Sequence, residues 1–291
     1  MVSKKSFTGS VVISGASSGI GEACAIYLDK LGYQVFAGVR SDADGEALKC
    51  KTSERLTPIF LDVTNEVSII AAANRIKATL DSTGLTGLVN NAGIVIAGPL
   101  EFLPVADLRE QFEINVIGQI AVTQAFLPLL RESQGRIINM SSDNGKVSIP
   151  FLGSYCASKF ALEALTDALR IELQPWGIAV CIIEPGSVTT PIWKKSISKA
   201  DNIWNNLPPE ARSLYSVFVD SAHKKANELS NNGFPAEVVA KAVAHALTTK
   251  RPKIRYVVGL DAKINIWLAK ILPDWILDKL IAHYLGIAKN S

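Results

Sequence analysis

The chain has 291 residues, 48% hydrophobic and 20% charged, a composition that excludes disorder and favours one globular domain with a large core. Thirty Lys and Arg against 27 Asp and Glu give a net charge of +3, and the basic residues are scattered, so we expect no nucleic-acid partner. Four cysteines, Cys24, Cys50, Cys156 and Cys181, are too few and too widely spaced for a disulfide framework or a metal-binding motif, so we expect reduced thiols and no metal.

Six short runs of β-branched and other apolar residues predict strands, each followed by a loop and a helical pattern. The predicted strands are residues 11–13, 34–39, 58–61, a run ending at 88–89, 136–139 and 179–183. The predicted helices include residues 22–31, ended by Gly32, and a segment with apolar residues at helical spacing from Ile69 to Leu80. Continuous apolar strands separated by helices are typical of a parallel sheet covered on both faces. We therefore predict an α/β, doubly wound Rossmann fold.

No repeat, low-complexity tract or linker divides the chain, so residues 1–291 are predicted to form a single domain, with a cofactor-binding and catalytic core at 8–190. The stretch 191–234 interrupts the alternation of strands and helices, and we interpret it as a helical substrate lid. It carries the aromatic residues Trp193, Trp204, Tyr215 and Phe218. Residues 262–287 predict a C-terminal extension of two amphipathic helices separated by Pro273.

The C-terminal helices have two possible settings. They would pack on the lid or on a second subunit, or they would lie on a membrane surface with Lys263, Lys270 and Lys279 on the polar side. Met1 to Gly9 leave no room for a signal peptide, and no segment has the roughly 18 uninterrupted apolar residues of a membrane span. We therefore expect a cytoplasmic protein, with peripheral membrane contact as an option.

A glycine-rich loop stands between the first predicted strand and the first predicted helix. It contains Gly15, Ser17, Ser18, Gly19, Ile20 and Gly21. Glycines there let a pyrophosphate approach the backbone, and the following helix points its N-terminus at the anion. The spacing differs from the general dinucleotide fingerprint, so the loop alone is also compatible with a simple tight turn.

The end of the second predicted strand bears on the choice of cofactor. A carboxylate at this point would bind the ribose hydroxyls of NAD, whereas an arginine accommodates the 2′-phosphate of NADP. The strand ends with Val39 and Arg40, and Asp42 comes only after them. We expect NADP, with NAD the less favoured alternative; the simpler reading is a surface arginine without a partner.

Tyr155 and Lys159 form the single Y-x-x-x-K sequence of the chain, and their spacing places them on one helical face. A nearby cation favours the phenolate, which suits a tyrosine for proton exchange at neutral pH. Ser142 follows the fifth predicted strand, where a loop brings its hydroxyl near the phenol. Asn115 is an amide in a mostly apolar helix and needs hydrogen-bond partners. Taken alone, a Tyr and a Lys four residues apart also arise by chance.

The order and spacing of these motifs resemble those of short-chain dehydrogenases/reductases over roughly residues 8 to 190. The matching motifs are the glycine loop, Asn90-Asn91-Ala92-Gly93, Asn115, Ser142, Tyr155 with Lys159, and Pro185-Gly186. Within that family the chain is most similar to the branch of retinol, hydroxysteroid and 3-hydroxybutyrate dehydrogenases. One departure is small: Ser14 stands where many members carry threonine.

The resemblance implies a role for each matching residue. Tyr155 would act as general acid/base, and Lys159 would lower its pKa and hold the nicotinamide ribose. Ser142 would orient the substrate oxygen, and Asn115 would support a water relay to Lys159. The other implied cofactor contacts are Asp62 and Val63 at the adenine, Asn91 at its ribose, and Val188 and Thr190 at the nicotinamide amide.

The expected function is an NADP(H)-dependent oxidoreductase that interconverts an alcohol and a ketone or aldehyde on a small lipophilic substrate such as a steroid, a retinoid or a long-chain compound. We also expect a homodimer or a homotetramer. Two alternatives are a dinucleotide-binding regulator without turnover and a sugar-nucleotide epimerase or dehydratase. The intact Ser142, Tyr155 and Lys159 set argues against the first, and the roughly 100 residues after the sixth strand are too few for the second.

Overall fold

The computed structural model describes residues 9–80 and 83–286, so the predicted boundaries at residues 8 and 287 lie outside it. A seven-stranded sheet has the order β3-β2-β1-β4-β5-β6-β9, and all neighbouring strands are parallel. The strands are β1 (Ser10–Ile13), β2 (Gln34–Val39), β3 (Leu56–Phe60), β4 (Gly87–Asn90), β5 (Arg136–Met140), β6 (Ala179–Pro185) and β9 (Arg255–Val258). The strand order reverses between β1 and β4. Folds of this kind bind ligands at that point, at the carboxyl ends of the strands.

The six predicted strands are confirmed, with boundaries that shift by a few residues. The strand β9 was not predicted; it is an edge strand whose residues are buried only alternately. The central strands β1 and β4 are buried along their whole length, which explains why their sequences are continuously apolar rather than alternating.

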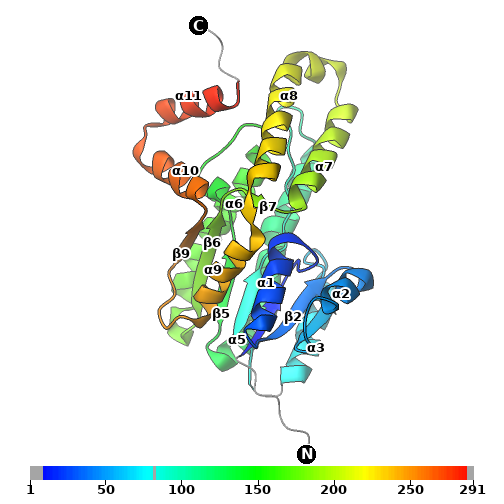
Figure 1. The fold of residues 1–291 in the computed structure, drawn as a ribbon, viewed down its shortest axis with the longest axis vertical. Coiled ribbons are helices and arrows are strands. Elements are labelled where there is room, and N and C mark those ends of the chain that lie inside the picture. The colour runs from blue at the N-terminus through cyan, green and yellow to red at the C-terminus, as the bar shows by residue number, and fades with distance from the viewer. Residues whose placement is uncertain (1–8, 81–82, 287–291) are drawn as a thin grey trace, which may run out of the picture.

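Helices cover both faces of the sheet (Figure 1). The core on one face includes residues of α1 (Gly19–Lys30), α2 (Asp42–Lys49) and α9 (Ala236–Thr248). The core on the other face includes residues of α3 (Glu66–Leu80) and α5 (Gly118–Ser133), with Leu169 of α6 (Gly153–Glu172) packed against it. The predicted doubly wound Rossmann fold is therefore confirmed. Two short 3-10 turns, Asp143–Gly145 and Gln174–Trp176, complete this part of the chain.

The region beyond the sixth strand forms two helical units at the ligand end of the sheet. The helices α7 (Ile192–Asn206) and α8 (Pro209–Asn232) form a pair that rises above the sheet in Figure 1. A small parallel pair, β7 (Val188–Thr189) and β8 (Phe234–Pro235), joins the two ends of this segment. The chain ends with α10 (Leu260–Ile271) and α11 (Asp274–Tyr284), separated at Pro273 as predicted.

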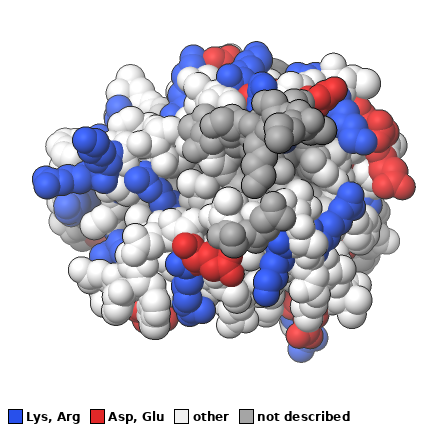
Figure 2. All heavy atoms as spheres, turned by 90° about the horizontal axis from the view of Figure 1, so that it is seen from below, with Lys and Arg blue, Asp and Glu red and all other residues white. Residues whose placement is uncertain are grey.

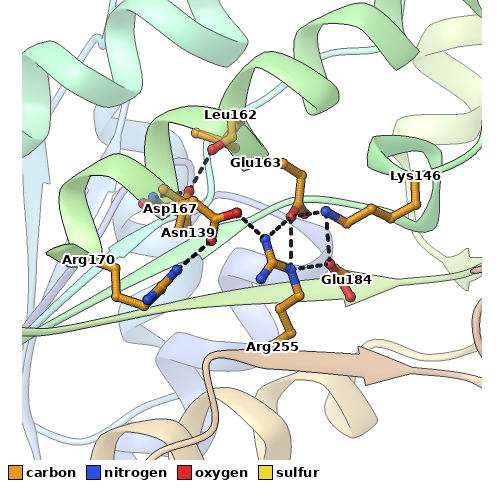
Figure 3. Close-up of polar contacts among 9 residues, drawn as sticks. Asn139, Lys146, Leu162, Glu163, Asp167, Arg170, Glu184 and Arg255 are labelled. Atoms are coloured by element: carbon orange, nitrogen blue, oxygen red, sulfur yellow. Dashed lines mark hydrogen bonds and ion pairs between the residues drawn. The ribbon is translucent and has the colours of Figure 1, made fainter.

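A network of charged residues attaches β9 to α6 and β6 (Figure 3). Lys146 donates to Glu163 of α6 at 2.8 Å, and Arg255 of β9 contacts both Glu163 at 3.2 Å and Glu184 of β6 at 3.3 Å. Arg255 also contacts Asp167 at 2.7 Å. Burial and the neighbouring carboxylate of Glu163 raise the pKa of Glu184 to about 7. The network therefore fixes the loop after β5 against β6 and β9.

The surface carries charges of both signs. Figure 2 shows lysines and arginines interspersed with acidic residues on the face at the N-terminal end of the molecule. Among the described residues, one helical run, Val105–Ser133, is long and apolar enough to cross a membrane. Half of its apolar window is buried inside the protein.

Candidate active site

The glycine loop forms a cradle whose backbone is open to a ligand. Gly15 has a φ of +65°, and a Cβ there would lie 2.8 Å from the Cα of Ala92. A side chain at Gly21 would overlap the carbonyl oxygen of Gly15. Because α1 begins at Gly19, the free N–H groups of its first turn lie at this loop. The loop therefore fits the pyrophosphate of a dinucleotide, as a tight turn of other residues would not.

Asn91 and Ser14 hold the glycine loop against the end of β4. The amide of Asn91 donates to the carbonyl oxygens of Ser14 and Gly15, each at 3.0 Å. In return, the Ser14 hydroxyl accepts from the backbone N–H groups of Asn91 and Ala92 at 3.0 Å. The hydroxyl of Ser14 therefore has a structural role. Threonine, which many members of the resembled family carry at this position, supplies the same hydroxyl. Asn91 shapes the loop besides lining the cavities at this edge.

A small cavity of about 100 Å³ lies between the ends of β1, β2 and β3. It brings together most of the residues expected at the adenosine end of the cofactor: Gly15, Ser17, Arg40, Asp62, Val63 and Asn91. Arg40 is exposed at its rim, and the carboxylate of Asp62 accepts from the backbone and hydroxyl of Thr64 at 3.0 and 2.8 Å. The end of β2 thus presents a guanidinium, and no carboxylate of β2 lines this cavity.

A second, larger cavity of about 690 Å³ lies at the carboxyl ends of β4, β5 and β6. It is lined by nine of the predicted site residues: Ser18, Gly19, Ile20, Asn91, Ser142, Tyr155, Lys159, Val188 and Thr190. Residues from the glycine loop, the loop after β5, α6 and the segment after β6 therefore meet at one place. Gly21 and Asn115 lie outside the lining of this cavity and support it from behind.

Tyr155 and Lys159 lie on the same side of α6, as their spacing predicted. The ammonium of Lys159 lies 5.7 Å from the centre of the Tyr155 ring and donates to the carbonyl oxygen of Met140 at 2.8 Å. Burial lowers the pKa of Lys159 to about 8. Burial raises the pKa of the Tyr155 phenol, and a hydrogen bond with Ser142 opposes that rise. In this structure burial outweighs the hydrogen bond with Ser142, and the ammonium of Lys159 faces a carbonyl oxygen.

Ser142 lies two residues beyond the end of β5 and caps the short turn that follows. Its hydroxyl accepts from the N–H of Asn144 at 3.2 Å and donates to the carboxylate of Asp143 at 3.0 Å. Its side chain also contacts the Tyr155 phenol. A serine hydroxyl and a phenol thus face the same cavity, an arrangement that can hold one oxygen atom of a substrate between two hydrogen-bonding groups.

Asn115 is completely buried in a π-helical turn, Glu113–Ile117, that interrupts the helix between α4 (Val105–Phe112) and α5. Its amide accepts from the N–H of Ile94 at 2.9 Å, and donates to the carbonyl of Ile94 at 3.0 Å and the hydroxyl of Ser158 at 3.1 Å. The hydrogen-bond partners expected for this amide are thus Ile94 and Ser158. Asn115 therefore ties the strand-end loop to α6, and the wider turn is a common feature of functional sites.

The predicted lid contributes less of the cavity wall than expected. Of the four aromatic residues named for the lid, only Trp193 lines the large cavity, and its indole N–H donates to the carbonyl of Val188 at 2.9 Å. Trp204 packs instead against a separate apolar cluster with Ile96, and Tyr215 donates to Glu101 at 2.7 Å. The C-terminal helices supply more of the wall, through Leu268, Leu277, Leu280, Ile281 and Tyr284. Hydrophobic periodicity identified both segments but cannot say which face meets the cavity.

Among the polar residues of the cavity that were not predicted are Asp143, Asp261 and Asn265. Asp143 follows Ser142 directly, so its proximity was readable from the sequence. Asp261 and Asn265 come from α10, more than a hundred residues later, and only the fold brings them near. Asp261 accepts from the N–H of Ser187 at 2.7 Å, and Asn265 donates to Asp143 at 2.9 Å.

The remaining candidate groups have structural roles. All four cysteines are free, and Cys156 is buried beside Tyr155 with its sulfur accepting from the N–H of Ile149 at 3.5 Å. Burial raises the pKa of the Cys156 thiol, which fits a small core residue better than a redox centre. Within the described ranges, no group of His, Cys, Asp and Glu side chains is arranged to hold a metal ion.

Comparisons with known proteins agree with this geometry. The family model described as short chain dehydrogenase matches residues 10–201. Retinol dehydrogenase 16 of Mus musculus is 38% identical, covering 93% of this chain and 87% of its own length. 17-beta-hydroxysteroid dehydrogenase type 6 of Rattus norvegicus is 38% identical, covering 94% of this chain and 87% of its own. A solved short-chain dehydrogenase from Streptomyces avermitilis is 27% identical with a TM-score of 0.74, covering 98% of this chain and 97% of that one.

Proposed function

Because the chain belongs to the short-chain dehydrogenase/reductase family, an oxidoreductase family that acts on CH–OH groups, we propose that it interconverts a lipophilic alcohol and its ketone or aldehyde with NADP(H). The observation that carries this proposal is the meeting of Ser142, Tyr155 and Lys159 in one cavity with the glycine loop. Neither a non-catalytic regulator nor an epimerase is favoured, because all three similar proteins named above are dehydrogenases.

The proposed proton transfer uses Tyr155. The bound dinucleotide supplies or accepts the hydride. In the reductive direction the phenol gives its proton to the substrate oxygen, and the burial that raises its pKa keeps it protonated at neutral pH. Ser142 holds the same oxygen by a second hydrogen bond. Lys159, whose ammonium now faces the carbonyl of Met140, would hold the hydroxyls of the nicotinamide ribose.

The preference for NADP rests on Arg40. This residue lies at the rim of the small cavity where the adenosine ribose of a dinucleotide would sit. A guanidinium offers a planar set of donors that matches phosphate oxygens. Asp62 carries the nearest carboxylate of this cavity, and its oxygen is already engaged by Thr64. The 2′-phosphate of NADP would therefore meet a free cationic group.

The proposed substrate class follows from the cavity wall. Apolar side chains line most of it beyond the catalytic hydroxyls, among them Ile94, Val147, Trp193, Leu268 and Leu277. A volume of about 690 Å³ suits a compound of drug-like size. Steroids, retinoids and long-chain alcohols combine that size with an apolar body and one oxygen to react.

The setting of the protein is also a proposal. We place it in the cytoplasm with its C-terminal helices touching a lipid surface, because these helices expose large apolar side chains beside lysines. The exposed residues include Leu260, Ile264, Trp267, Ile271 and Trp275, with Lys263, Lys270 and Lys279. Sedimentation with anionic vesicles should carry the protein down, and Trp267→Ser with Trp275→Ser should leave it in solution. Sedimentation equilibrium would test the expected homodimer or homotetramer.

The proposed activity is tested by following NADPH absorbance in a screen of retinal, ketosteroids and simple ketones with the purified protein. Bulky apolar carbonyl compounds should consume NADPH, and acetone should be a poor substrate. Turnover only with NADH would refute the cofactor assignment. No turnover of any carbonyl compound or corresponding alcohol with either cofactor would refute the function.

A further inference from the structure

The wall of the large cavity is mostly apolar but also holds polar residues, Lys195 and His283 among them. Ser142, Asp143, Tyr155, Asp261 and Asn265 all line this cavity. Asp143 touches Ser142 and Asn265, and Ser142 touches Tyr155, so the carboxylate of Asp143 is one residue away from the reacting oxygen. A group that binds this carboxylate would therefore sit beside the carbon that is oxidised or reduced.

The carboxylate of Asp143 is buried without a cation. Its residue is only 8% exposed, and within the described part of the chain no lysine, arginine or histidine forms an ion pair with it. The two nearest lysines along the chain are engaged elsewhere. Lys146 is bound to Glu163 at 2.8 Å, and Lys159 to the carbonyl of Met140 at 2.8 Å.

The donors that Asp143 does have are neutral. Ser142 donates at 3.0 Å and Asn265 at 2.9 Å, and the backbone of Asn144 also contributes. An ionised carboxylate has about four acceptor positions, so at least one stays open. Burial and the nearby carboxylate of Asp261 raise the pKa of Asp143. A cation brought in by a ligand would relieve both effects, whereas an apolar group there would add to the cost of the buried charge.

We propose that Asp143, oriented by Asn265, is a specificity-determining residue that binds a protonated amine on the substrate, next to the alcohol or carbonyl carbon. The inference rests on the proposed function and narrows its substrate class to amino alcohols and amino ketones with an apolar body. The apolar wall takes the body, Ser142 and Tyr155 take the oxygen, and Asp143 takes the ammonium. Asp261 adds a second negative charge at the same end of the cavity.

Two matched compounds test this assignment: 2-amino-1-phenylethanol, which is cationic at neutral pH, and 1-phenylpropan-1-ol, in which a methyl group replaces the ammonium. Binding to the protein loaded with NADP is measured by calorimetry. The amino alcohol should bind about 10- to 100-fold more tightly, the effect of one charge-assisted hydrogen bond. Asp143→Asn should abolish most of this ratio, and Asn265→Leu should reduce it. Asp278→Asn, which removes an exposed carboxylate of α11, should retain it.

The ratio cancels any general effect of Asp143→Asn on Ser142, and the wild-type comparison needs no variant at all. Equal binding of the two compounds by the wild type, a preference for the phenylpropanol, binding of neither, or an unchanged ratio in Asp143→Asn would each overturn the inference. Oxidation of the same two alcohols reports separately on the proposed function. If the wild type oxidises the phenylpropanol but shows no preference for the amine, the function stands and the role of Asp143 is wrong.

Discussion

The preference for NADP over NAD can be tested at Arg40, because this one exposed side chain carries the proposed preference. It lies at the rim of the adenosine-side cavity, and among the described residues no carboxylate forms an ion pair with it. Replacing it with alanine removes the guanidinium without disturbing a packed core. We expect Arg40→Ala to weaken the binding of NADPH and to leave the binding of NADH nearly unchanged.

The size of this effect follows from the exposure of the side chain. A charge-assisted hydrogen bond contributes about 1.5–3 kcal/mol when it is shielded from water. Because Arg40 is exposed, the lower end of that range applies, which corresponds to roughly a tenfold change in affinity. Arg40→Lys should fall between the wild type and alanine, since an ammonium keeps the charge but loses the planar pair of donors.

Fluorescence titrations of the two reduced cofactors provide the assay. The wild type should bind NADPH about tenfold more tightly than NADH, and the preference should disappear in Arg40→Ala. Arg75→Ala, an exposed arginine of α3 that lines neither cavity, is the matched control and should behave as the wild type. Equal affinities in the wild type, or a parallel loss of NADH binding in Arg40→Ala, would refute the reasoning.

Three further predictions concern protonation and the cavity wall. Burial raises the pKa of Glu184 from 4.5 to about 7, so between these pH values the folded protein keeps a proton that the unfolded chain releases. The contribution of Glu184 to the free energy of unfolding therefore falls as pH rises from about 4.5 to about 7. In urea unfolding, Glu184→Gln should show a flatter dependence of stability on pH in that window, and the same dependence as the wild type would contradict the prediction. Burial lowers the pKa of Lys159 to about 8, so the affinity for NADPH should fall as pH rises through about 8 in the wild type. Lys159→Met should show no such fall. Equal pH profiles of the two proteins would exclude the proposed contact of Lys159 with the nicotinamide ribose. For straight-chain alcohols, kcat/KM should rise about fourfold per added methylene, equivalent to about 0.8 kcal/mol. Trp193→Ala should diminish this rise, because Trp193 lines the cavity. A kcat/KM that does not change with chain length would exclude an apolar substrate site.

The strands and the meeting of Ser142, Tyr155 and Lys159 at one cavity were largely predictable from the sequence because their signals are local. The buried strands are continuous apolar runs, Tyr155 and Lys159 are one helical turn apart, and the glycine loop lies between a strand and a helix. The edge strand β9 was not predicted; it is buried only at alternate residues, and Arg255 binds it to α6 and β6 through ion pairs.

The parts of the site that were not predicted depend on contacts between distant segments. Asn265 meets Asp143 across 122 positions of the chain, and the C-terminal helices line the cavity from beyond the predicted lid. Burial raises the pKa of Tyr155, and the Lys159 ammonium turns to the carbonyl of Met140; the sequence indicates neither. Side-chain direction and burial are properties of the packed fold.

The central claim, that Tyr155 transfers the proton in an alcohol–carbonyl interconversion, is tested most directly by the turnover of Tyr155→Phe with NADPH bound. The account predicts a loss of about two to four orders of magnitude in kcat with cofactor affinity preserved. Tyr27→Phe, on α1 and outside both cavities, should keep the wild-type rate. Turnover by Tyr155→Phe within a few-fold of the wild type would contradict the account.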